Sequence, residues 1–157
     1  MSNVVDLRVH KATQERSGAS KFIYIAAPFT ARERARELKD MVEAAGHVST
    51  ASWIPSHLSD YDNLSATQLL TEAKHDALGV RRSDIIVLIN NEGPSTSGGM
   101  HVEFGLALAY GKGVIIVGEK TNLFHYFDKI VFAPTIHDVV DRIGRVVEAN
   151  KAAPEAA

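Results

Sequence analysis

Cysteine is absent from the sequence, which excludes disulfide bonds, thiolate catalysis and Cys-ligated zinc or iron–sulfur centres. An excess of positive charge is also absent, because 17 basic and 19 acidic side chains give a formal charge of -2. No overall positive field therefore indicates a nucleic-acid or anionic membrane partner. No apolar run reaches the roughly 18 residues of a membrane span, and the first residues lack the apolar segment of a secretory signal. These absences favour a soluble, cytoplasmic protein.

The common cofactor and hydrolase motifs are missing as well. The sequence has no G-x-x-x-x-G-K-[ST] phosphate loop and no G-x-G-x-x-G dinucleotide fingerprint. Its histidines include His101, His125 and His137, but none stands in an H-x-x-x-H or H-E-x-x-H spacing, and Ser97 lacks a G-x-S-x-G turn. We therefore expect neither a cofactor nor a metal, and no serine-hydrolase site.

What the chain does contain is a regular alternation of strand and helix patterns. Its 157 residues, 45% of them hydrophobic, fit one globular domain. Short β-branched or fully apolar runs predict strands at 22–26, 48–53, 85–89, 114–117 and 130–132. Amphipathic stretches that follow capping boxes at Thr30/Glu33 and Ser65/Gln68, or a cap at Thr135, predict helices between and after them. The alternation predicts a single-domain α/β fold, a doubly wound (Rossmann- or flavodoxin-like) parallel sheet of about five strands.

Three regions follow from this pattern: a flexible N-terminal arm at 1–20, the domain at 21–150 and a frayed tail at 151–157. Ligands of doubly wound sheets bind beyond the carboxyl ends of the strands, so the loops after Ala26, Trp53, Asn90 and Val117 are the candidate binding loops. The loop from Asn90 to Gly99 leads from a buried strand into a helix, and its N–H groups suit an anion or hydroxyls. A simple glycine-rich turn explains it equally well.

Glu103 is the more specific candidate. It lies early in a predicted helix at 100–110 that is apolar on nearly every side, and a carboxylate there is costly to bury without a partner. The helix N-terminus is expected to keep Glu103 ionised, as a nucleophile requires. The alternative is an acid on the solvent side of the helix, because glutamate is almost never buried without a partner.

Asp76 and Tyr24 raise similar questions. Asp76 shares a helical stripe with Leu69, Ala73 and Val80, where desolvation would raise its pKa and suit it to donate a proton. A surface ion pair with Arg81 or Lys74 is the alternative, and on these residues alone it is favoured. Tyr24 near the end of the first strand is more often core than catalytic, yet its hydroxyl needs a partner if buried.

Aromatic side chains that could stack on a planar ring stand in two places. One is Trp53, and the other is the group formed by Phe124, Tyr126 and Phe127. Packing in the core is the more frequent fate of such residues.

The sequence resembles the nucleoside 2-deoxyribosyltransferases and the related 2'-deoxynucleoside 5'-monophosphate N-glycosidases over roughly residues 21–132. The resemblance lies in four pieces, which are Ile23-Tyr24-Ile25-Ala26, Asp76 upstream of Ser83-Asp84, the run from Ser97 to Gly105 with Gly111-Lys112, and Asn122-Leu123-Phe124-His125-Tyr126. Each piece is weak alone, and their order makes the resemblance fairly specific.

The resemblance implies roles for individual residues. Glu103 matches the family's nucleophile, which forms a glycosyl-enzyme intermediate, Asp76 matches the acid that protonates the departing base, and Tyr24 matches a tyrosine that positions the nucleophile. Asn122 matches an asparagine that reaches the sugar in a neighbouring subunit's site, so a homodimer or higher oligomer is implied. The expected substrate-binding residues are Ala26, Phe29, Trp53, Asn90, Ser97, Gly98, Gly99, Asn122, His125 and Tyr126.

Two departures bear on the reaction. The transferases often place an aspartate six residues before the nucleophile, whereas this chain has Ser97, which is similar to the hydrolases that hold a 5'-phosphate there. In the first loop, Pro28 and its neighbours lack the hydroxyl and glycines of those hydrolases. The expected reaction is cleavage of a 2'-deoxynucleoside with transfer of the sugar to another free nucleobase. The alternatives are hydrolysis of a nucleoside 5'-monophosphate or a non-catalytic nucleotide-binding module.

Overall fold

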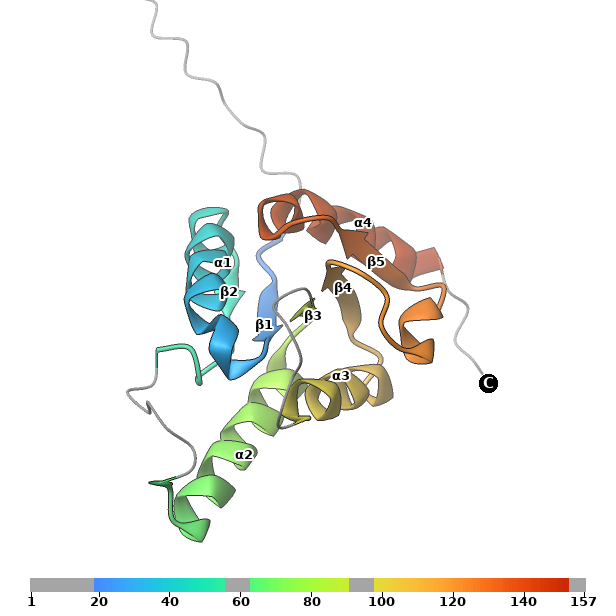
Figure 1. The fold of residues 1–157 in the computed structure, drawn as a ribbon. Helices are drawn as coiled ribbons and strands as arrows, with labels where there is room; N and C mark the ends of the chain where they lie inside the picture. The colour runs from blue at the N-terminus through green and yellow to red at the C-terminus, as the bar shows by residue number, and fades with distance from the viewer. Residues whose placement is uncertain (1–18, 56–62, 91–97, 153–157) are drawn as a thin grey trace, which may run out of the picture.

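The computed structural model describes residues 19–55, 63–90 and 98–152, and a single parallel sheet lies at its centre (Figure 1). The strand order is β2-β1-β3-β4-β5. The strands are β1 (Phe22–Ala26), β2 (Val48–Ser49), β3 (Ile85–Ile89), β4 (Gly113–Val117) and β5 (Ile130–Ala133). Every neighbouring pair is parallel, so the predicted doubly wound α/β sheet of about five strands is confirmed.

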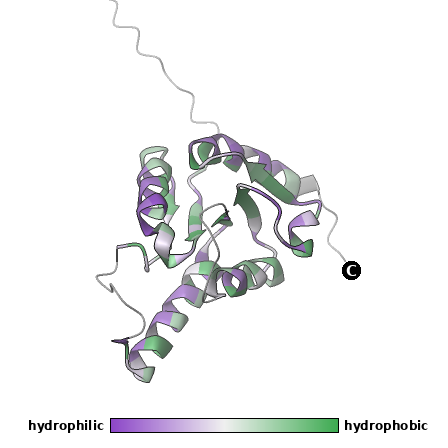
Figure 2. Ribbon diagram, viewed as in Figure 1, coloured by the Kyte–Doolittle hydropathy of each residue, from purple (hydrophilic) through white to green (hydrophobic). Residues whose placement is uncertain are grey.

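Two helical layers cover the sheet. On one face lie α1 (Arg32–Ala44) and α4 (Val139–Ala152), and on the other lie α2 (Ala66–Arg82) and α3 (Gly99–Ala109) (Figure 1). Short 3-10 turns occur at Phe29–Ala31 (η1), Leu123–Tyr126 (η3) and Ile136–Asp138 (η4). Because helices cover both faces, β3 and β4 are buried at every position, which is why their sequences are apolar without alternation. Figure 2 shows the strands green inside helices with purple outer sides.

The predicted helix starts have mixed outcomes. Ser65 and Gln68 form the expected reciprocal capping box at the start of α2. No such box forms at Thr30, because the chain first makes the η1 turn after Pro28 and α1 then begins at Arg32 without a capping side chain. The side chain of Glu33 instead pairs with Arg36 one turn later.

The second strand is much shorter than the predicted range 48–53. Among the described residues β2 lies at the edge of the sheet with β1 as its one partner, and the register pairs Val48 with Phe22 and Ser49 with Ile23. The chain then leaves the sheet, and the Thr50 hydroxyl donates to the carbonyl of Gly79 at 3.0 Å. Residues 52–55 form a turn, so the apolar residues after Ser49 pack as a loop and not as a strand.

The predicted apolar stripe of α2 is buried only at its C-terminal end. Val80 is fully buried, but Leu69, Leu70 and Ala73 are exposed. The reason is geometric: the N-terminal half of α2 extends past the strands of the sheet (Figure 1). No helix among the described residues is long and apolar enough to cross a membrane. The predicted arm at 1–20 and the predicted tail at 151–157 lie largely outside the described residues.

Candidate active site

The candidate site lies where the chain order of the strands reverses. From β1 the chain moves outward to β2, whereas from β3 it moves the other way to β4, and this switch point is where doubly wound sheets bind ligands. Tyr24 lies in β1 opposite Ile86 of β3. Glu103 comes from α3 and Asp76 from α2, the two helices that cover this face. We call Tyr24, Asp76 and Glu103 the Tyr–Asp–Glu triad, or simply the triad.

A single hydrogen bond answers two questions that the sequence raised. Tyr24 is fully buried, and its hydroxyl donates to Oε1 of Glu103 at 2.8 Å. The buried hydroxyl thereby gains the partner that it needs, and so does a carboxylate on an otherwise apolar helix. Glu103 therefore does not lie on the solvent side of α3; its side chain points inward to β1.

Asp76 is the third member of the triad and is partly buried on α2. One turn further along this helix, Gly79 packs so closely on the Tyr24 ring that an added Cβ would lie 2.8 Å from ring atom Cε2. Within the described residues, Asp76 forms no ion pair with Lys74 or Arg81, and its buried Oδ1 has no hydrogen-bond partner. A buried carboxyl oxygen without a protein partner can meet a ligand atom.

Burial raises the pKa values of all three triad side chains. It raises the pKa of Glu103 to about 8, with the Asp76 charge adding to the increase and the Tyr24 hydrogen bond opposing it. Burial also raises the pKa of Asp76 to about 6; the Tyr24 hydroxyl opposes this shift, and the charge of Glu72 adds to it. Burial and then the two carboxylate charges raise the pKa of Tyr24 far above its ordinary value, so the phenol keeps its proton.

These pKa values confirm one expectation and correct another. Desolvation does raise the pKa of Asp76, as a proton donor requires. The helix N-terminus, however, does not keep the pKa of Glu103 low, because burial and the like charge of Asp76 outweigh it. Near neutral pH the coupled pair therefore carries about one proton, and the higher pKa places that proton mainly on Glu103. When that proton lies on Asp76, Glu103 is an anion that accepts the Tyr24 hydroxyl, which is the form able to act as a nucleophile.

The start of α3 depends on a glycine. Gly98, the residue before the helix, has φ +69°, a left-handed conformation that strongly favours glycine. Gly99 is the first residue of the helix, and Glu103 follows four residues later. The helix thus begins directly after the loop that follows β3. Ser97, which was predicted to face a 5'-phosphate, lies outside the described residues.

Asn90 ties together two loops at the carboxyl edge. Its side-chain nitrogen donates to the Glu119 carbonyl at 2.7 Å and to the Thr121 hydroxyl at 2.9 Å. The loop after β3 is thereby linked to the loop after β4. This places Asn90 at the predicted edge, with its amide nitrogen engaged within the protein.

The motif from Asn122 to Tyr126 forms the η3 turn. Asn122 Oδ1 accepts from the backbone N–H of Phe124, and its Nδ2 lies 2.9 Å from Nε2 of His125, so both ends of the amide are engaged in its own chain. His125 is fully buried, packed edge-on against Phe104, and burial lowers its pKa. His125 therefore supports η3 from within, and Tyr126 remains exposed.

The remaining predicted contacts divide between core and surface. The Ala26 side chain and the Trp53 ring are buried, and the indole N–H of Trp53 donates to the Ile25 carbonyl at 2.8 Å. Trp53 thus packs in the core, which is the more frequent fate of such an aromatic residue and was the alternative to stacking on a ligand. Phe29 is only partly buried, and the Arg32 guanidinium lies over its ring at 5.3 Å.

Two cations near this edge were not anticipated from the sequence. Arg32 also donates to the carbonyls of Trp53 and Ile54, and Lys120 lies over the rings of Tyr126 and Phe132 at 4.4 and 4.8 Å. No periodicity or motif marks either residue, because each owes its place to loops that the fold brings together. The described residues contain no cluster of three or more His, Asp or Glu side chains that could hold a metal.

Comparison with known proteins supports the fold. No protein-family model matches the sequence, and no curated protein matches it. Among solved structures, the chain is similar to a CMP N-glycosidase from Clostridium botulinum, BcmB, with a TM-score of 0.51 and 17% sequence identity. The similarity covers 80% of this chain and 99% of that chain. At this identity the likeness concerns the arrangement of strands and helices.

Proposed function

We propose that the protein cleaves the N-glycosidic bond of a 2'-deoxynucleoside through a covalent intermediate on Glu103. The observation that carries this proposal is the Tyr24–Glu103 hydrogen bond beside the buried Asp76 Oδ1, which has no hydrogen-bond partner among the described residues. Retaining cleavage of a glycosidic bond needs one ionised carboxylate and one carboxyl that holds a proton. The coupled pair carries about one proton near neutral pH, and the proposed reaction proceeds from the form in which this proton has moved from Glu103 to Asp76.

The proposed reaction has two steps. In the first, a Glu103 oxygen attacks the anomeric carbon, the carbon–nitrogen bond breaks, and the departing base takes a proton from Asp76. In the second, an acceptor attacks the same carbon and releases Glu103, while Asp76 recovers its proton. The Tyr24 hydroxyl stabilises the Glu103 anion before attack and after release.

The acceptor decides the type of reaction. With a second free nucleobase the sugar is transferred, and this is the reaction that the sequence resemblance favours. With water the protein is an N-glycosidase, and the similar solved structure of a CMP N-glycosidase favours this second candidate, with a nucleoside 5'-monophosphate as the substrate. In that case Ser97 and the N–H groups at the start of α3 would hold the phosphate.

The other proposed contacts follow the loops at the carboxyl edge. Asn90, Gly98, Gly99 and Phe29 would bind substrate together with the backbone at Ala26. Tyr126 has an exposed ring that can contact a base or the sugar. No cofactor enters the proposed reaction, because attack, protonation and release use only the triad and the acceptor.

We also propose that the protein works as a homodimer or higher oligomer. Large apolar side chains are exposed on three elements: Leu69 and Leu70 on α2, Val102 on α3, and Leu123 and Phe124 on η3. Exposed apolar surface, where it gathers in a patch, favours an interface between proteins. The resemblance places Asn122 at a neighbouring subunit's sugar, and η3 carries that residue beside this surface.

The experiment is a panel of nucleosides and 5'-monophosphates incubated with the purified protein, with and without a second base, and analysed by chromatography. Release of free base supports cleavage, and a new nucleoside that appears only with the second base supports transfer. Glu103→Gln should abolish turnover, whereas Glu148→Gln on the exposed side of α4 should not.

Trapping tests the covalent step separately. A slowly reacting 2'-fluoro analogue should add the mass of the sugar to the peptide that contains Glu103. Binding of nucleotides with no base release from any substrate would contradict the enzymatic proposal and favour a non-catalytic nucleotide-binding module.

A further inference from the structure

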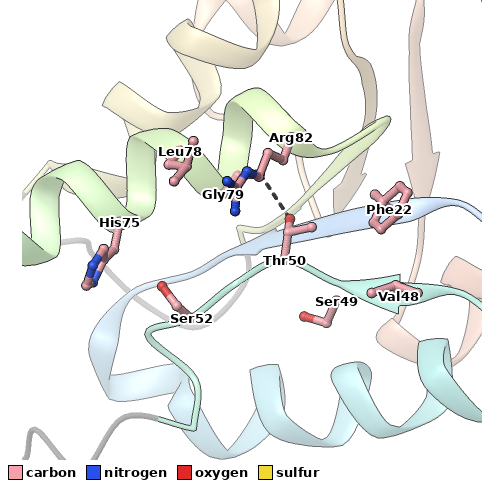
Figure 3. A pocket seen from close by; sticks show the side chains of 9 residues that line it. All are labelled: Phe22, Val48, Ser49, Thr50, Ser52, His75, Leu78, Gly79 and Arg82. Atoms are coloured by element: carbon pink, nitrogen blue, oxygen red, sulfur yellow. Dashed lines mark hydrogen bonds between the residues drawn. The ribbon is translucent and has the colours of Figure 1, made fainter.

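A groove of about 630 Å³ lies between α2 and the edge strand β2, and none of the three triad residues lines it (Figure 3). Its volume falls within the range of sites that bind small molecules. The groove exists because β2 is the last strand of the sheet and ends after two residues. Beyond it, α2 has no further strand to cover.

The floor of the groove is apolar. The register pairs Phe22 with Val48, so the two side chains lie next to each other on the face that α2 covers. They are 48% and 44% exposed, and Leu78 on α2 is 39% exposed, so three large apolar side chains of one groove all remain open to solvent. A flat apolar group placed here would cover all three.

The rim of the groove is polar and has no negative charge. Its basic side chains are His75 and Arg82 on α2, and the hydroxyls of Thr50 and Ser52 lie across from them (Figure 3). No carboxylate is among the described residues that line the groove. The nearest acid in sequence to Arg82 is Asp84, and its Oδ2 already accepts from the backbone N–H of Phe22. Within the described residues, the Arg82 guanidinium has no hydrogen bond or ion pair, so it can receive an anion.

The groove and the triad are separated by one thin wall. Gly79 lines the groove and also packs closely against the Tyr24 ring and the Thr50 carbonyl. A Cβ added to Gly79 would lie 2.6 Å from the Thr50 carbonyl oxygen. His75 in the groove is also the neighbour of Asp76, so a ligand bound here contacts the helical turn that carries a triad residue.

We infer that this groove is a second binding site, for a small ligand with a flat apolar body and one anionic group. The apolar body lies on Phe22, Val48 and Leu78, and the anion pairs with Arg82. The inference uses only the chemistry of the groove and does not depend on the proposed reaction.

The test uses naphthalene-1-sulfonate as the probe and 1-naphthalenemethanol as its uncharged counterpart. Each is titrated into the isotope-labelled full chain, and backbone amide shifts are followed by NMR. Arg82→Gln removes the proposed anion partner, and Arg81→Gln is the matched control, because Arg81 is exposed on the same turn of α2 but does not line the groove.

We expect saturable shifts centred on 22, 48–52 and 75–82 with the sulfonate. Arg82→Gln should weaken its binding about fivefold, as loss of a partly exposed ion pair does, while Arg81→Gln should leave it unchanged. The uncharged counterpart should bind the wild type about fivefold more weakly. An absence of saturable shifts in the groove, or equal losses in both variants, would overturn the inference.

Discussion

Replacing Tyr24 with phenylalanine should move the titration of Glu103 to higher pH. The variant removes only the hydroxyl, and the ring can keep its place against Gly79. In the wild type that hydroxyl donates to Glu103 at 2.8 Å and lowers a pKa that burial has raised to about 8. A hydrogen bond to a charged group contributes about 1.5–3 kcal/mol. Because one pKa unit corresponds to about 1.4 kcal/mol, the pKa of Glu103 should rise by about one to two units.

The assay needs no substrate. The carboxyl carbon of Glu103, labelled with ¹³C, reports its protonation state by NMR across a pH series, and Glu103→Gln assigns the signal. If the protein cleaves nucleosides as proposed, the acid limb of its kcat/KM profile should move upward by the same amount, since the attacking carboxylate must be ionised.

Tyr110→Phe is the matched control, because this tyrosine is exposed at the C-terminal end of α3 and should leave the titration unchanged. The reasoning is refuted if Glu103 in Tyr24→Phe titrates at the wild-type pH or below it. That outcome would mean that the hydrogen bond favours the protonated carboxyl.

Further predictions concern pH, leaving groups, the 5' position and packing. Glu103 has a folded pKa of about 8, above its ordinary 4.5, so its protonation stabilises the fold at low pH, and this contribution is lost as pH rises from 4.5 through about 8. In urea denaturation the free energy of unfolding of Glu103→Gln should therefore change less over this pH range than that of the wild type. Asp76→Asn should lose more rate with poor leaving bases than with activated ones, and equal losses would assign the residue to binding. Ser97→Asp should reduce kcat/KM for a 5'-monophosphate far more than for the nucleoside, whereas equal factors would show that the residue does not face the 5' group. Gly79→Ala should lower stability by about 1–3 kcal/mol in thermal or urea unfolding, because its Cβ would meet the Tyr24 ring at 2.8 Å, and an unchanged midpoint would contradict that contact.

The sequence by itself determined the type of fold. Runs such as Ile85–Ile89 are short, β-branched and apolar at every position, which is typical of a strand covered on both faces, so a parallel sheet with helices on both sides could be predicted. Capping at Ser65 was equally local, because it depends on residues three positions apart. The length of β2 and the start of α1 were not predictable, since the first depends on how far β1 offers a partner and the second on the turn after Pro28.

For the candidate site, the sequence identified which residue types mattered, and the tertiary structure decided how they interact. Glu103 and Tyr24 stood out separately because each had a polar group in apolar surroundings, but they are 79 positions apart and only the fold makes them partners. The charge state of Glu103 was wrongly predicted from its helix position, because burial and the neighbouring Asp76 act across space and outweigh the local helix end. Trp53 and Asn90 show the same limit: spacing placed them at the right edge, and packing decided that one ring is buried and that one amide links two loops. Local patterns fix secondary structure because they involve neighbours in the chain, whereas pKa values, partners and exposure depend on residues that meet only after folding.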